Sequence, residues 1–226
     1  MPKAVIFDVD GTLIDSVDLH AKAWQDAFRD FGHDIDIAVI RGQIGKGGDQ
    51  LMPVFLSQSE LAKQGKELEK RRGELLRQTY LSQVTAFPKV RELFERLKSD
   101  GTRIALASSA KEDELASYKE VLQIDGLVDV ETSSDDAEKS KPHPDIFQVA
   151  LKRLGVPATQ ALVVGDTPYY DAEAAAKAGL RTIGLLCGGS SDASLKKAGC
   201  IAIYQDPADL LERYDQSPII RDVEVT

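Results

Sequence analysis

The chain has 226 residues, of which 42% are hydrophobic and 29% charged, so it can bury a sizeable core in one large domain or two small ones. Its formal net charge of −9 argues against nucleic acid or an anionic membrane as a main partner, because both attract basic surfaces. The two cysteines, Cys187 and Cys200, lack metal-type spacing, and no apolar run approaches the ~18–20 residues of a membrane span. With no signal-peptide pattern after Met1, these features predict a cytoplasmic protein with reduced thiols.

A buried strand is predicted at residues 4–7, and two carboxylates follow it. Asp8 and Asp10 come directly after the apolar run, before a Gly11–Thr12 turn signal. Side chains alternate along a strand, so the two carboxylates point the same way if Val9 stays extended. Two adjacent anions repel each other, and a divalent cation with oxygen ligands, such as Mg²⁺, resolves that repulsion. A solvated acidic turn is the alternative for this short motif taken alone.

The next segment, from residue 17 to about residue 83, carries helical patterns. Near its start, apolar side chains recur at helical spacing: Ala23, Trp24, Ala27, Phe28 and Phe31. Further helices are predicted at residues 37–43, 49–56 and 60–83, with a glycine-rich turn at 45–48. The Lys- and Glu-rich stretch 60–72 is typical of a solvated helix face.

Strands and helices alternate from residue 88 onward. Strands are predicted at 103–107, 128–132, 161–164, 182–186 and 202–204, and helices at 90–98, 112–122, 144–154, 171–178, 195–198 and 207–214. This alternation predicts an α/β fold with a doubly wound parallel sheet, in which the helical segment is an insertion after the first strand. We therefore expect a core domain of residues 1–15 and 86–226 and a helical cap domain of residues 16–85.

Polar side chains follow four of the predicted strands, where ligands bind in sheets of this kind. They are Asp8 and Asp10, then Ser108 and Ser109, then Lys141, and finally Asp166 with Asp171. The serine hydroxyls and backbone N–H groups suit a phosphate. Lys141 precedes a predicted helix, so a cation and a helix dipole can both face an anion. Together the set predicts one metal site, one phosphate site and one nucleophile.

In order and setting, four motifs resemble those of the haloacid dehalogenase-like hydrolases: Asp8-Val9-Asp10-Gly11-Thr12, Ser108, Lys141-Pro142 and Gly165-Asp166…Asp171. The resemblance covers essentially the whole chain. The helical insertion is similar to the small cap of the phosphoglycolate phosphatase and β-phosphoglucomutase branch. True dehalogenases of the superfamily lack the second aspartate, so the resemblance implies phosphoryl transfer.

The resemblance also implies a role for each motif residue. Asp8 would attack phosphorus and become an aspartyl phosphate, and Asp10 would protonate the leaving oxygen and then deprotonate the hydrolytic water. Mg²⁺ would be bound by the Asp8 carboxylate, the Asp10 backbone carbonyl and Asp166. The transferring oxygens would be held by Ser108, the Ser109 backbone N–H and Lys141. Asp171 would orient the metal shell or Lys141, and its five-residue spacing from Asp166, where four is common, leaves direct ligation open.

Several residues have a structural alternative. Ser109 also suits a helix N-cap, and Asp171 suits a helix N-cap or a place in the first turn of a helix. His20, on the first cap helix, is either an exposed residue or a group near the leaving group. In the Gly45–Gly48 loop, Lys46 is a candidate for substrate specificity, and the cap residues Arg71 and Arg72 are candidate substrate-binding cations. A plain turn and a solvated face are the alternatives for these three.

The function predicted from these features is a Mg²⁺-dependent phosphatase of a small phosphorylated metabolite, with a cap that closes over the core. One alternative is a sugar-phosphate mutase that shares Asp8, Asp10 and His20. The other is a non-catalytic regulatory or binding protein that keeps the fold. The sequence predicts no particular substrate and no oligomeric state.

Overall fold

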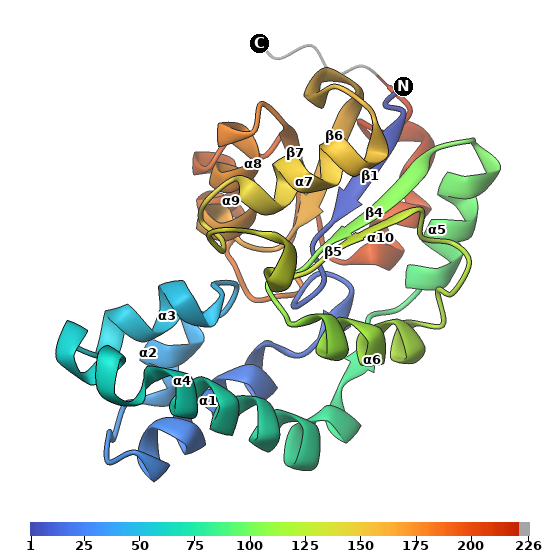
Figure 1. The fold of residues 1–226 in the computed structure, drawn as a ribbon. Helices are drawn as coiled ribbons and strands as arrows, with labels where there is room; N and C mark the ends of the chain where they lie inside the picture. The colour runs from blue at the N-terminus through green and yellow to red at the C-terminus, as the bar shows by residue number, and fades with distance from the viewer. Residues whose placement is uncertain (222–226) are drawn as a thin grey trace.

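A sheet of six parallel strands forms the centre of the protein, whose computed structural model describes residues 1–221. The strands span Ala4–Phe7 (β1), Arg103–Ala107 (β4), Val130–Thr132 (β5), Ala161–Gly165 (β6), Arg181–Leu185 (β7) and Ala202–Tyr204 (β8). Their order is β5-β4-β1-β6-β7-β8, so β1 lies in the interior between β4 and β6 (Figure 1). This order confirms the doubly wound α/β fold, and the strand order reverses beside β1.

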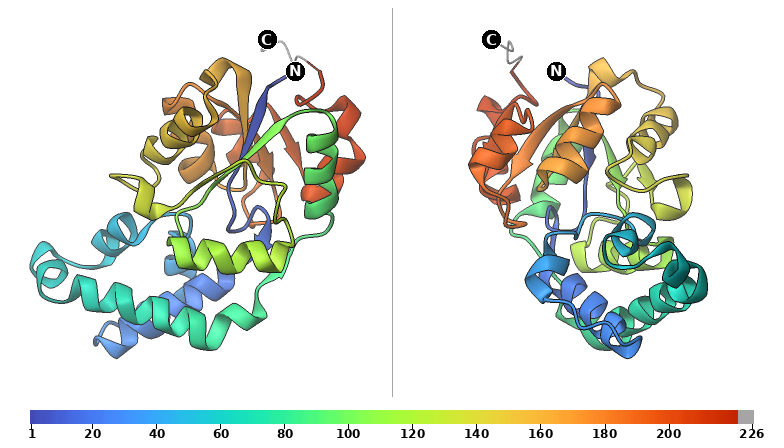
Figure 2. Two further views of the ribbon diagram at one scale, coloured as in Figure 1. Left: turned by 45° about the vertical axis from the view of Figure 1, so that its right-hand side comes forward. Right: turned by 90° about the vertical axis from the view of Figure 1, so that its left-hand side faces the viewer.

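Helices cover both faces of the sheet (Figure 2). They are α5 (Val90–Ser99), α6 (Glu112–Leu122), α7 (Asp145–Leu154), α8 (Glu173–Lys177), α9 (Asp192–Lys197) and α10 (Pro207–Glu212). Alternate side chains of β1 point to opposite faces of the sheet. Val5 and Phe7 pack in the apolar cluster that includes α5, α6 and α10. Ala4 and Ile6 pack in the apolar cluster that includes α7 and α8. A strand buried on both faces reads as a continuous apolar run, which explains the run at residues 4–7.

Four helices fill the segment that the sequence predicts to be helical: α1 (Val17–Asp30), α2 (Ile37–Arg41), α3 (Gly48–Phe55) and α4 (Gln58–Leu75). They enclose an apolar cluster of their own, which includes Trp24, Phe28, Leu51 and Leu68. Figure 1 shows these helices gathered beside the carboxyl end of the sheet. Within residues 1–221, no helix has the length and apolar character needed to cross a membrane.

The single helix expected at residues 60–83 is divided in the structure. Helix α4 begins at Gln58 because Ser57 and Glu60 form a capping box, in which each side chain binds the backbone of the other residue. After Leu75 the chain continues as a π-helical turn, Leu76–Tyr80, and a 3₁₀ turn, Leu81–Gln83. Hydrophobic spacing does not distinguish these turns from an α-helix, because all of them place side chains around one axis.

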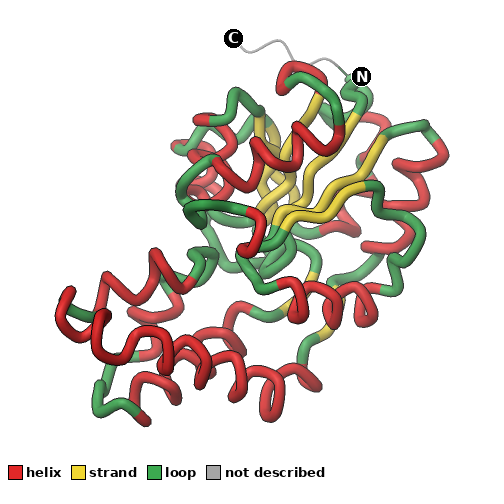
Figure 3. The backbone as a smooth tube through the Cα atoms, viewed as in Figure 1, coloured by secondary structure: helices red, strands yellow, loops and turns green. Residues whose placement is uncertain are grey.

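Both chain segments that join the helices to the core lie side by side. They form an antiparallel pair of two-residue strands, β2 (Ile14–Asp15) and β3 (Thr85–Ala86), in which Ile14 pairs with Ala86 and Asp15 with Thr85. Figure 3 shows the pair between the sheet and the helical layer. No strand is predicted in these segments, because two residues are too short for an alternating pattern.

Candidate active site

The predicted site residues lie at one edge of the sheet. Asp8 follows β1, Ser108 follows β4 and Asp166 follows β6, and these three strands are neighbours. The backbone N–H of Asp8 donates to Val164 O at 2.9 Å, which extends the pairing of β1 with β6 by one residue. Because the strands are parallel, their carboxyl ends meet at this edge and bring together side chains that are far apart in the sequence.

Three buried carboxylates gather there. Asp8, Asp166 and Asp171 each offer an oxygen within 4.8 Å of the others. Lys141 Nζ donates to Asp8 Oδ1 at 2.5 Å and to Asp171 Oδ1 at 2.8 Å, and its side chain is only 1% exposed. Three carboxylates around one ammonium group leave an excess of two negative charges when all four groups are ionised. A divalent cation with oxygen ligands offsets such an excess, so the donor set fits Mg²⁺.

The electrostatics of the cluster reflect this crowding. Burial, together with the Asp171 carboxylate, raises the pKa of Asp8 to about 7, although Lys141 acts in the opposite direction. Burial and the same carboxylate hold the pKa of Asp166 well above its usual range. Burial alone would lower the pKa of Lys141, but Asp171 and Asp8 raise it above its usual value. The cluster therefore keeps the lysine charged and disfavours full ionisation of its carboxylates.

Thr12 belongs to the cluster, although the sequence gives it no role beyond the turn and the end of the first motif. Its Oγ1 lies 3.0 Å from Asp8 Oδ2 and 3.1 Å from Asp166 Oδ1, and it has one proton to donate between them. Gly11, with φ +81°, turns the chain so that Thr12 faces back toward Asp8. A Cβ at Gly188 would lie 1.7 Å from Asp166 Oδ2, so this glycine also permits the close packing around the cluster. The sequence signal that could have predicted this role is a hydroxyl side chain placed directly after the turn at the end of a strand.

Asp10 lies in a separate network. Its Oδ1 accepts hydrogen bonds from Ser16 Oγ and lies next to His20 Nε2, each at 2.7 Å. Burial alone would raise the pKa of Asp10, but His20 and Ser16 outweigh that effect and lower it. His20 is buried, so its alternative as an exposed helix residue is wrong. Asp8 and Asp10 thus follow one strand but have different partners and different ionisation behaviour.

The two serines after β4 contact different elements. Ser108 is buried, and its Oγ accepts the Ala110 N–H at 3.0 Å. Ser109 Oγ donates to the Gly45 carbonyl at 3.0 Å, which ties the core to the glycine-rich cap loop. Helix α6 begins beyond it with Lys111 as the N-cap residue, so the helix-cap alternative for Ser109 is wrong.

Asp171 combines a structural and an electrostatic position. Its Oδ2 accepts the Thr167 N–H at 3.0 Å and the Thr167 hydroxyl at 2.7 Å, within the first turn of the π-helical segment Pro168–Ala172. Its Oδ1 faces Lys141. The first-turn role and the place beside Lys141, offered as alternatives by the sequence, therefore coexist in one side chain.

A cavity between cap and core is lined by Asp8 and Asp10 on one side and by the cap residues His20, Lys46 and Arg72 on the other. An adjoining cavity of about 200 Å³ shares Lys46 and Arg72. Lys46 Nζ donates to Gln43 Oε1 at 2.6 Å, and burial lowers its pKa.

Arg71 lies elsewhere. Its Nε donates to Asp30 at 2.7 Å, and it lines a different cavity that none of the other predicted site residues lines. The structure therefore brings Arg72 to the cavity of the cluster and leaves Arg71 outside it.

Comparison with known proteins agrees with this arrangement. Residues 5–185 match the model of the family described as haloacid dehalogenase-like hydrolase. The chain belongs to this family. One relative is the phosphorylated carbohydrates phosphatase of Thermotoga maritima. It is 28% identical to this chain over 210 residues, which cover 92% of this chain and 96% of that protein. A phosphoglycolate phosphatase of Shigella sonnei is 30% identical over 232 residues, with 92% and 91% covered.

The fold is shared with solved structures of hydrolases. A hydrolase from Pseudomonas syringae has a TM-score of 0.85 and 30% identity, over 94% of this chain and 98% of that chain. The match covers sheet and helical cap together. The haloacid dehalogenase-like resemblance seen in the motifs is thereby confirmed, and the chain is a hydrolase by family.

Proposed function

We propose that this haloacid dehalogenase-like hydrolase is a Mg²⁺-dependent phosphatase of a small phosphorylated metabolite, acting through an aspartyl phosphate on Asp8. One observation carries the proposal: a buried carboxylate, Asp8, contacts a buried lysine within an acidic cluster, while a second carboxylate, Asp10, lies apart beside His20. Two carboxylates in different environments suit two different tasks, nucleophile and acid–base group.

Mg²⁺ would be held by the carboxylates of Asp8 and Asp166 and by the backbone carbonyl of Asp10. Asp171 would act on this site directly or through Lys141, which it contacts at 2.8 Å. When bound, the ion would offset the repulsion between the nucleophile and the phosphate and stabilise charge in the transition state. The excess negative charge of the cluster supports this assignment.

Phosphoryl transfer to Asp8 and hydrolysis of the aspartyl phosphate would be the two steps of the reaction. In the first, a carboxylate oxygen of Asp8 forms a bond to phosphorus, the bond to the leaving oxygen breaks, and Asp10 gives that oxygen a proton. In the second, a water oxygen attacks phosphorus, Asp10 takes the water proton, and the Asp8–phosphorus bond breaks to release inorganic phosphate. Ser108, the Ser109 N–H and Lys141 would hold the phosphate oxygens.

Asp10 must hold a proton when the first step begins. In the substrate-free protein its pKa lies below the usual value, as its contacts with His20 and Ser16 favour the charged form. A phosphate bound next to it brings negative charge, which raises the pKa of a neighbouring carboxyl. Substrate binding would therefore favour the protonated acid that the leaving oxygen needs.

The helical segment would act as a cap domain of residues 16–85 over a core of residues 1–15 and 86–226. The two segments that connect it to the core, β2 and β3, are paired with each other, so the cap would move as one body. Its residues Lys46, His20 and Arg72 would contact the leaving group. The metabolite would be small, because the cavity lined by Asp8 holds only about 20 Å³ and the cavity that adjoins it holds about 200 Å³.

We infer that the protein acts on such metabolites in the cytoplasm and binds neither nucleic acid nor membrane. The net charge of −9 supports this inference, because it repels phosphate backbones and anionic lipids. Both cysteines are free, as is typical of a reducing compartment.

The test is phosphate release with and without Mg²⁺ across phosphoglycolate, hexose 1- and 6-phosphates and nucleotides. We expect metal-dependent turnover of at least one compound, abolished in Asp8→Asn because the amide is not a nucleophile. The matched control is Asp113→Asn, which makes the same chemical change at an exposed site on α6.

Two other outcomes would overturn the proposal. Isomerisation of β-glucose 1-phosphate upon addition of the 1,6-bisphosphate, without phosphate release, would identify a mutase that uses the same Asp8, Asp10 and His20. No turnover in either assay would favour the non-catalytic regulatory or binding protein.

A further inference from the structure

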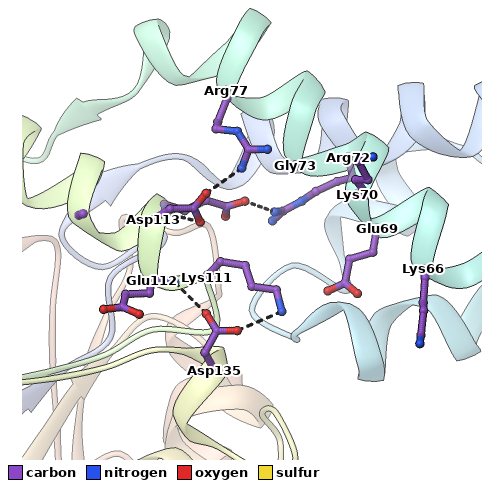
Figure 4. A pocket seen from close by; sticks show the side chains of 12 residues that line it. Lys66, Glu69, Lys70, Arg72, Gly73, Arg77, Lys111, Glu112, Asp113 and Asp135 are labelled. Carbon is purple, nitrogen blue, oxygen red and sulfur yellow. Dashed lines mark hydrogen bonds and ion pairs between the residues drawn. The ribbon is translucent and has the colours of Figure 1, made fainter.

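Arg72 joins the cap to the core through one hydrogen bond and contacts a second cap residue through another. From α4, its Nη1 donates to Oε1 of Glu114 on α6 at 2.7 Å, and its Nη2 lies 2.9 Å from Nδ1 of His20 on α1. The Glu114 side chain is 2% exposed and that of Arg72 is 14% exposed. Figure 4 shows Arg72 reaching from α4 across the cleft toward α6. The guanidinium group thus links a buried core carboxylate to the imidazole that contacts Asp10.

The geometry of this link is not the one that stability alone favours. An arginine usually offers two parallel N–H groups to one carboxylate. Here the second N–H group points to His20, and Arg72 Nε and Glu114 Oε2 are left without a hydrogen-bond partner among the described residues. Buried polar atoms without partners destabilise a fold. In this arrangement the second N–H group of Arg72 instead orients the imidazole of His20.

The contact with Arg72 determines where the imidazole proton lies. Arginine has only donors, so His20 Nδ1 must accept from Nη2, and a proton on Nδ1 would face another N–H group. The ring proton is therefore on Nε2, 2.7 Å from Asp10 Oδ1. The Tyr118 hydroxyl oxygen, 3.1 Å from Nε2, can then only accept from it.

We propose that Glu114 and Arg72 are positioning residues that hold His20 in the Nε2–H tautomer, with its N–H group directed at Asp10 Oδ1. The inference rests on the proposed function in so far as Asp10 is taken as the acid–base group. Ser16 and His20 both donate to Oδ1, and among residues 1–221 no hydrogen bond to Oδ2 is found. Oδ2 is therefore the atom that carries the proton to the leaving oxygen and receives the proton of water.

The arrangement depends on how cap and core meet. His20 and Arg72 belong to the cap helices α1 and α4, whereas Asp10, Glu114 and Tyr118 belong to the core. The two cap side chains thus lie between two core carboxylates. The direction of the His20 N–H group toward Asp10 therefore depends on contacts that cross between cap and core.

The tautomer is measured directly by NMR of the full-length protein with ¹⁵N-labelled histidine and bound Mg²⁺. The chain has three histidines, and His20→Asn identifies the signals of His20. We expect protonated Nε2 and unprotonated Nδ1 in the wild type, and a mixture of tautomers in Arg72→Met, which lacks the donor. A proton on Nδ1 in the wild type would overturn the proposal, and no variant is needed for that result.

Kinetics test the part played by Glu114. Glu114→Gln is expected to lower kcat by about 10- to 100-fold with a smaller change in KM, because the variant disturbs orientation and not substrate contact. The matched control is Asp113→Asn, the neighbouring residue on α6, which is exposed and pairs at 3.0 Å with Arg77 of the π-helical turn that follows α4. We expect kcat of the control to stay within about twofold of wild type.

Each result is informative. A decrease in kcat no larger for Glu114→Gln than for Asp113→Asn would overturn the role of Glu114. If Glu114→Gln does not fold, Arg72→Met and the wild-type spectrum still decide the tautomer. The spectra need no turnover, so an Nε2–H signal in a protein without phosphatase activity would reject the proposed function and leave the positioning of His20 intact.

Discussion

Lys141 shows how one residue links electrostatics to chemistry. An ammonium group is strongly hydrated, and its burial is tolerated only with paired carboxylates. Here Asp8 and Asp171 both contact its Nζ, and both raise its pKa, so the lysine stays charged at the site. The sequence places a lysine after a strand and before a helix. The burial of that lysine depends on two aspartates from other parts of the chain.

Adding one methyl group at Gly188 tests whether the packing around Asp166 matters for metal binding. Gly188→Ala would place a Cβ 1.7 Å from Asp166 Oδ2, so the carboxylate must shift. We expect the Mg²⁺ concentration for half-maximal phosphate release to rise by about tenfold or more, because displaced supporting contacts weaken metal sites by that order. The measurement is a Mg²⁺ titration of activity, with Gly65→Ala as the control away from the site. An unchanged half-saturation in Gly188→Ala would contradict this view of the cluster.

Helix α4 combines a stable start with a functional face. Its capping box satisfies donors at the N-terminus, Leu68 packs into the apolar cluster of the cap, and Arg72 crosses to the core. Glycine in a helix interior is destabilising by about 0.5–1 kcal/mol relative to alanine, and α4 contains Gly65 and Gly73. The helix is thus less stable than its length allows, both at Gly65 and at Gly73, which directly follows Arg72.

Gly65→Ala is expected to stabilise the protein by about 0.5–1 kcal/mol, with a small rise in Tm and unchanged kcat. The added Cβ would meet Leu61 Cδ2 at 3.7 Å, an ordinary contact. Thermal unfolding measures the change. Gly32→Ala is the matched comparison: it has open space but φ +85°, so we expect it to lower Tm. A lower Tm for Gly65→Ala would show that the cap cluster has no room for the methyl group.

At the scale of the whole molecule, stability and activity are in conflict at the acidic cluster. The sheet brings three carboxylates to one buried place, and their pKa values record the unfavourable charge: that of Asp8 is about 7 and that of Asp166 lies well above its usual range. A group with a raised folded-state pKa stabilises the fold only while it is protonated. Without metal, the fold therefore loses stability as pH rises from about 4 through 7, the window set by Asp8.

Mg²⁺ is expected to reverse this loss, because it binds the folded protein and favours ionised carboxylates. We expect the rise in Tm caused by Mg²⁺ to be larger at pH 8 than at pH 5. Thermal unfolding at the two pH values, with and without the ion, measures it. In Asp8→Asn the metal-free Tm should be higher than wild type at pH 8, since a buried charge is removed. An equal effect of Mg²⁺ at both pH values would contradict the assignment of the cluster as the metal site.

Sequence reasoning was most successful where a signal is local. Apolar runs and helical spacing predicted the strands, the helices and their alternation, because those patterns are set by neighbouring residues. It missed β2 and β3, whose pairing joins residues about 70 positions apart. It also missed Glu114 and Tyr118, which look like ordinary residues of an amphipathic helix and gain their roles only from His20 and Arg72.

By itself, the sequence determined the α/β fold with its helical insertion and the family motifs around Asp8, because strand-end chemistry can be read from residues adjacent in the chain. Only the tertiary structure decided which cap side chains face the core: it brought Arg72 and Lys46 to the cavity and left Arg71 bound to Asp30. It also decided the state of each charged group. Arg71 and Arg72 are neighbours in the sequence, but successive helical residues point about 100° apart, and the packing of α4 against α6 selects one of them.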